Sequence, residues 1–144
     1  MLPWRKKKKS APERPPVTVD GVGVFAVHGE DFLTCDSPVT GLFRCLTIYI
    51  GEQDDYSKQQ LELIKSIAPS FENTVSLALV YLKNDKGFLE DHEIYGELEY
   101  ESVTVLPDDH ENDYSLSFQF SKWDDGWVEV EFKNGKPVLH SVND

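Results

Sequence analysis

The side chains that could perform catalysis in this chain are scattered and do not form a known motif. The sequence contains no glycine-rich phosphate loop, no His-Glu-x-x-His zinc motif and no nucleophile elbow. Its four histidines stand far apart, at positions 28, 92, 110 and 140. The adjacent acids of Asp124-Asp125-Gly126 predict a tight turn, because this residue pattern favours turn geometry over an acid–base pair. We therefore predict no catalytic residues and no cofactor.

The sequence contains two groups of possible metal ligands, and neither predicts a metal site. Asp108-Asp109-His110-Glu111 could contact a cation, but it lacks the spacing and the glycine of a calcium loop. Cys35 and Cys45 cannot complete a zinc site by themselves, and they do not form a Cys-x-x-Cys pair. We expect a solvated loop at the first group, and two buried or half-buried thiols at the second.

Acidic residues alternate with apolar ones in two segments that are typical of half-buried strands. Leu98 and Tyr100 alternate with glutamates, and Trp127 should face away from the apolar stripe of its own segment. An exposed tryptophan among acids has the composition of a protein-binding hot spot. The alternative is that Trp127 packs under the acidic loop. The candidate binding residues are Glu97, Glu99, Glu101, Trp127, Glu129 and Glu131.

The charge of the chain is divided between a basic start and an acidic remainder. Residues 1–16 carry six basic side chains and one acidic one, whereas residues 17–144 carry 8 basic and 25 acidic ones, a net charge of −17. An acidic body repels nucleic acid phosphates and favours a basic protein partner, although the charge can also serve solubility alone.

The first sixteen residues predict a disordered, basic, proline-rich arm. Prolines at 12, 15 and 16 oppose regular pairing, and the run Arg5 to Lys9 is a solvated charge run. Trp4 beside these lysines could give weak contact with a membrane or an anionic polymer. The alternative is an unstructured, solubilising tail.

The segment from Tyr56 to Lys83 predicts two helices with a break between them. Ser57-Lys58-Gln59-Gln60 has the form of a capping box, in which each end bonds the backbone N–H of the other. Pro69 favours a break followed by the first turn of a second helix. The apolar stripe of that helix should be buried against a sheet, with Leu77, Val80 and Tyr81 widening it. Its members are Phe71, Val75, Ala78, Leu79 and Leu82.

Alternating apolar residues predict strands on both sides of the helices. A phase shift near Glu101-Ser102 indicates a bulge, and Asn134-Gly135 indicates a hairpin. The fold class that follows is α+β, an antiparallel sheet of about six strands with two central helices packed on one face, in a single domain over 17–144. The strand segments are 17–28, 32–35, 42–50, 97–105, 115–121, 127–133 and 138–142.

Three motifs, in this order along the chain, carry a resemblance to a known group of proteins. They are Gly21-Val22-Gly23-Val24-Phe25, the helix start Ser57-x-x-Gln60, and the ending from Trp123 to Lys136. Their arrangement over 17–142 resembles small, acidic, mostly uncharacterised bacterial proteins, some of which look like immunity proteins that neutralise toxins of neighbouring cells. The resemblance implies no catalytic residues, and the basic arm falls outside it.

Together these patterns predict a non-catalytic, acidic protein-binding domain, immunity-like, whose partner is a basic toxin or another basic protein. We expect it in the cytoplasm, because no apolar run approaches the roughly 20 residues of a membrane span and no secretory signal follows the basic start. Two alternatives stay open: an enzyme with an unrecognised site, and a surface-tethered structural protein that uses the arm. The sequence does not indicate an oligomeric state.

Overall fold

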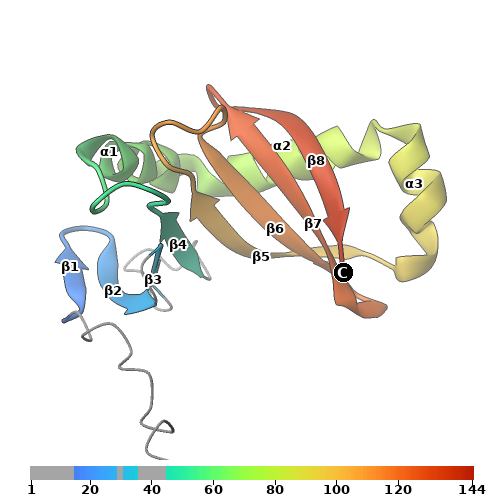
Figure 1. Ribbon diagram of the computed structural model, residues 1–144. Coiled ribbons are helices and arrows are strands. Elements are labelled where there is room, and N and C mark those ends of the chain that lie inside the picture. Colours follow the sequence, from blue (N-terminus) through green and yellow to red (C-terminus); the bar gives the residue numbers. More distant parts are fainter. Residues whose placement is uncertain (1–14, 29–30, 36–44) are drawn as a thin grey trace, which may run out of the picture.

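The computed structural model describes residues 15–28, 31–35 and 45–144, and has an α+β fold (Figure 1). The expectations for the arm up to residue 14, and for residues 42–44 of one predicted strand, lie outside the described residues. Residues 15 and 16, the end of the predicted arm, are exposed. The domain predicted from residue 17 onwards begins with the first strand at Val17.

Within the described residues, eight strands form one sheet in the order of the chain, from β1 to β8. Most neighbours are antiparallel, but β4 pairs with β5 in parallel. The prediction of an antiparallel sheet of about six strands was therefore only roughly right. The strands are β1 Val17–Val19, β2 Gly23–His28, β3 Phe32–Cys35, β4 Leu46–Tyr49, β5 Leu98–Val105, β6 Tyr114–Phe120, β7 Trp123–Lys133 and β8 Lys136–Asn143.

The parallel pairing arises because the helices of the described part of the chain lie between β4 and β5. A chain that leaves a sheet through a long helical connection can return beside the strand it left in the same direction. The connection contains α1 Lys58–Ile67, α2 Phe71–Lys83 and α3 Lys86–His92. Short 3₁₀ turns follow α1 at Ala68–Ser70 and α3 at Glu93–Tyr95. In the described part of the chain, no helix combines the length and apolar character of a membrane span.

The capping box and the break at Pro69 are confirmed. Ser57 Oγ accepts from Gln60 N at 3.0 Å, and Gln60 Oε1 accepts from Ser57 N at the same distance. Pro69 lies in the 3₁₀ turn between α1 and α2, where its missing N–H removes no α-helical bond.

Helix α2 covers one face of the sheet but is less buried than its sequence suggested. Figure 1 shows α2 passing behind β6, β7 and β8. Phe71, Ala78 and Leu82 are at most 1% exposed, as predicted. Val75 and Leu79 are only partly buried, and Leu77 and Val80 are 47% and 54% exposed. The prediction of a wider buried face was therefore wrong for Leu77 and Val80, which lie on the side of α2 away from the sheet, whereas Tyr81 is partly buried against the core.

The remaining core lies between the helices and the inner face of the sheet. Val128, Val130 and Phe132 of β7 are fully buried, and so are Leu46 and Ile48 of β4. Cys35 is buried and Cys45 is half-buried, as predicted for two thiols.

The turn predicted at Asp124-Asp125-Gly126 is wrong, because these residues are a bulge inside β7. The register passes from Gln119 opposite Trp127 to Phe120 opposite Trp123, so three residues of β7 stay unpaired. The Gln119 amide nitrogen donates to the carbonyls of Trp123, Asp124 and Gly126 at 2.7–3.1 Å. A Cβ at Gly126 would overlap the Trp123 ring, which explains the glycine. The predicted bulge at Glu101 and the turn at Asn134-Gly135 are both confirmed.

Candidate functional site

The face of β5–β8 that points away from α2 is polar, and we call it the open face. It carries four of the six predicted binding residues. Apolar residues of β7 alternate with Trp127, Glu129 and Glu131, which therefore lie on this face. The register extends the face across three strands. Its rows, read from β5 to β7, are Glu99–Gln119–Trp127, Ser102–Ser117–Glu129 and Thr104–Ser115–Glu131.

Trp127 is half-buried on the open face and contacts the neighbouring acid. Its indole nitrogen lies 3.4 Å from Glu129 Oε1. The polar loop instead reaches Glu131, four residues further along β7, where Asn112 donates at 3.1 Å and His110 Nε2 lies 3.9 Å away. The contacts of the loop thus fall at Glu131, and Trp127 lies beside Glu129.

The other two predicted residues, Glu97 and Glu101, lie at the border of the open face. Glu101 is the extra residue of the β5 bulge, and Glu97 directly precedes β5; both are exposed, like Glu99. The predicted alternation with the apolar Leu98 and Tyr100 is therefore confirmed, since these two are half-buried. Glu97 also borders a pocket that the sequence did not predict.

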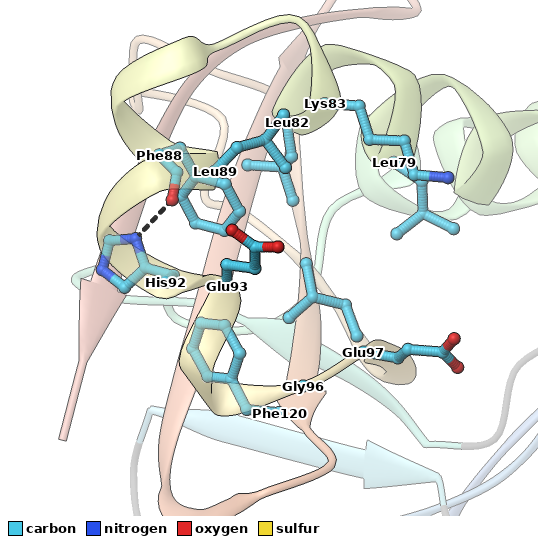
Figure 2. A pocket seen from close by; sticks show the side chains of 11 residues that line it. Leu79, Leu82, Lys83, Phe88, Leu89, His92, Glu93, Gly96, Glu97 and Phe120 are labelled. Carbon is cyan, nitrogen blue, oxygen red and sulfur yellow. Dashed lines mark hydrogen bonds between the residues drawn. The ribbon is translucent and has the colours of Figure 1, made fainter.

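That pocket, of about 410 Å³, lies between α2, α3 and the start of β5 (Figure 2). A volume of this size falls in the range of about 300–1,000 Å³ that ligand pockets occupy. Lys83 from the end of α2, His92 from α3, and Glu93 and Glu97 beyond it add polar groups. Its apolar lining consists of Leu79, Leu82, Phe88, Leu89, Leu98 and Phe120.

The segment that forms one wall of the pocket is fixed by hydrogen bonds of its backbone to the backbone and the Ser121 hydroxyl of the turn after β6. Glu97 N donates to Ser121 Oγ at 2.9 Å, Ser121 N donates to Glu97 O at 2.8 Å, and Lys122 N donates to Tyr95 O at 2.9 Å. Gly96 has a φ of +82°, and a Cβ there would overlap Ser121 Oγ. Glycine is therefore required, and the wall is held in place without any ligand.

The pocket was not predicted because its third wall, α3, is not one of the two helices that the sequence indicates. Asp85 accepts from Phe88 N at 3.1 Å and so caps α3, a signal that was present in the sequence. Rings then fix this short helix on the sheet: Phe88 stacks with Phe120, and His92 lies 5.9 Å from the same ring. His92 Nδ1 lies 2.9 Å from Phe88 O (Figure 2).

The described residues do not assemble a cation site. Over 15–28, 31–35 and 45–144, no group of three His, Cys, Asp or Glu side chains is placed to hold a metal ion. His110, from the polar stretch considered above, accepts instead from Asn112 N at 3.0 Å. Burial raises the pKa of Tyr114 from 10.0 to about 12, a direction that keeps the phenol neutral and unsuited to acid–base work near pH 7.

Compared with protein-family models, with curated proteins and with solved structures, the chain has no match.

Proposed function

We propose that this is a non-catalytic, acidic domain that binds a basic protein partner, in the manner of an immunity protein against a basic toxin. The observation that carries the proposal is the open face, on which Glu129 lies beside a half-buried Trp127, with Glu99 and Glu131 on the same face. The net charge of −17 over residues 17–144 supports it, because charge complementarity accelerates encounter with a partner of opposite sign.

The open face has the two features that protein-binding surfaces combine. Tryptophan supplies a large contact area at small entropic cost, and it is enriched at interface hot spots. The surrounding carboxylates would steer a basic partner and fix its orientation, since exposed charges affect mainly the association rate. The neighbouring Ser115, Ser117 and Gln119 are small or polar, so they leave the Trp127 ring as the main apolar anchor.

The test measures association kinetics with a partner captured from the native host by the purified domain. In one variant, Glu97, Glu99 and Glu101 are changed to Lys. In a matched variant, Glu52, Glu62 and Glu72, three exposed acids outside β5–β8, are changed to Lys. Both change the net charge by the same amount, so only position differs. We expect the first variant to associate at least about tenfold more slowly than the second, and rising salt to slow the wild type.

Trp127→Ala should change the dissociation rate of the complex. Removing an aromatic anchor shortens the lifetime of a complex, so the off-rate should rise while the on-rate stays within about twofold. Association that does not depend on salt, together with wild-type binding by the β5 variant and by Trp127→Ala, would contradict the proposal and leave the charge as a solubility device.

A further inference from the structure

The pocket between α2, α3 and β5 is bordered by exposed apolar side chains that nothing in the described structure covers. Leu89 in its lining is 42% exposed, and Ile94, in the 3₁₀ turn beyond α3, is 74% exposed. Single exposed apolar residues are common, but Leu89 lines a hollow with an apolar lining, and Ile94 directly follows Glu93 of the same lining. Figure 2 shows the leucines and the two phenylalanine rings gathered around this hollow.

The charges around the same hollow are mainly negative. Glu93 and Glu97 line it and are exposed, and α3, one of its walls, also carries the exposed Glu90, Asp91 and Lys86. Figure 2 shows the Glu93 carboxylate reaching over the hollow and the Glu97 carboxylate at its edge. Lys83 is the cation on the α2 side. A ligand that fits must therefore combine an apolar group with positive charge next to it.

We propose that this pocket receives one large apolar side chain, leucine or an aromatic, from a segment of the partner in which lysine or arginine flanks that side chain. The apolar group enters between Leu89 and Phe120, and the flanking cations pair with Glu93 and Glu97. The wall fixed by Gly96 and Ser121 needs no rearrangement, so little binding energy is lost to ordering. The inference rests on the proposed function and specifies how the partner is recognised.

Glu97 connects this pocket with the open face. It lines the pocket, and Glu99, two residues later on β5, lies in the row that contains Trp127. A basic segment anchored in the pocket would therefore lead towards the carboxylates of the open face.

The test uses synthetic peptides as probes: acetylated Lys-Lys-Leu-Lys-Lys amide, the same peptide with Gly in place of Leu, and Ser-Ser-Leu-Ser-Ser. Binding to the full chain is followed by NMR through the leucine methyl groups and the backbone amides. We expect the Leu peptide to bind about tenfold more tightly than the Gly peptide, the gain expected from burying one leucine. The methyl signals of Leu79, Leu89 and Leu98 should shift, and the Ser peptide should bind more weakly than the Lys peptide.

Leu89→Ser, with Leu77→Ser as the matched control, makes the test specific. Both leucines are exposed to a similar degree, 42% and 47%, but only Leu89 lines this pocket. The advantage of the Leu peptide should vanish in Leu89→Ser and persist in Leu77→Ser. Equal binding of the Leu and Gly peptides, with shifts confined to the open face, would overturn the pocket proposal and leave the proposed function standing.

Two further outcomes would also overturn the pocket proposal. If the Ser peptide binds as tightly as the Lys peptide, the pocket takes apolar groups without regard to charge. If deletion of residues 1–14 shifts the same methyl signals in the free protein, the occupant is the chain's own basic segment. The kinetic experiment with the captured partner is independent of these peptides, so failure of the proposed function itself would be recognised separately.

Discussion

A single side-chain amide, that of Gln60, joins the first turn of α1 to the ends of two strands. Its nitrogen donates to Tyr49 O at 2.9 Å and to Leu106 O at 3.0 Å, beside β4 and β5. Its oxygen accepts from Ser57 N and from Gln53 Nε2. The residue is 1% exposed, so all its hydrogen-bonding capacity is used away from water.

Gln60→Glu should destabilise the fold although it keeps the shape of the side chain. The new carboxylate oxygen would face two carbonyl oxygens and donate to neither, which leaves buried polar groups unsatisfied at a cost of at least about 1–3 kcal/mol. Gln59→Glu is the control. Because Gln59 is exposed, this substitution should change the free energy of unfolding by no more than about 0.5 kcal/mol. Urea unfolding of both variants measures the difference, and equal midpoints would contradict this assignment.

At this scale, the sequence predicted what a residue does for its neighbours in the chain. The bond between Ser57 and Gln60 was predicted because a capping box involves residues three positions apart. The hydrogen bonds from Gln60 to Tyr49 and Leu106 were not predicted, since they depend on where β4 and β5 end in space. The same holds for Gln119, whose amide completes the β7 bulge.

Helix α2 shows how burial is distributed within one element. The periodicity of the sequence treats Leu79 and Leu82 alike, and both line the pocket, but Leu82 is 1% exposed whereas Leu79 is half-buried. Periodicity gives the angle at which side chains leave a helix, and it does not give the extent of the layer against which they pack.

Leu82→Ala should therefore lower the free energy of unfolding by about 2–5 kcal/mol, the range for a fully buried leucine. Leu79→Ala should cost clearly less, because part of its surface already faces the hollow, and Leu77→Ala should cost no more than about 0.5 kcal/mol. Denaturant unfolding of the three variants gives the ranking. If Leu79→Ala lowers the free energy of unfolding as much as Leu82→Ala does, the pocket is closed in solution.

The β7 bulge is an element whose prediction failed for an identifiable reason. Two aspartates and a glycine are typical of a turn, and the true turn, at Ser121-Lys122, lacks both glycine and proline. The glycine is instead required by the ring of Trp123, which packs on Tyr95 at a centroid distance of 4.5 Å. A contact between residues in different elements thus selected a residue that usually indicates a turn.

At the scale of the whole molecule, the fold class and the separation of a polar sheet face from an apolar one could be predicted. They follow from alternation within each strand, which requires no knowledge of neighbours. The number of strands and the mixture of parallel and antiparallel pairing could not be predicted. Both depend on how the chain before the helices meets the chain after them. Four of the six residues predicted for binding lie on the open face, whereas the pocket was not predicted, since separate elements form it.

The parallel pairing of β4 with β5 has a consequence for the order of events in time. It joins Leu46 to Val103 across all three helices, whereas β5 to β8 follow one another as antiparallel neighbours over short connections. Closing a long connection costs entropy before any contact repays it. We infer that the meander of β5–β8 nucleates folding and that β1–β4 are added late.

Rates of folding and unfolding can verify this order. Val130→Ala, in the centre of the meander, should mainly slow refolding, and Ile48→Val, in β4, should mainly accelerate unfolding. Stopped-flow kinetics in denaturant separates the two effects, and the opposite pattern would place the nucleus in the first half of the chain. If this order holds, β5–β8, which carry the open face, pair with one another before β4 pairs with β5. A partly folded chain would then already expose the glutamates of the open face.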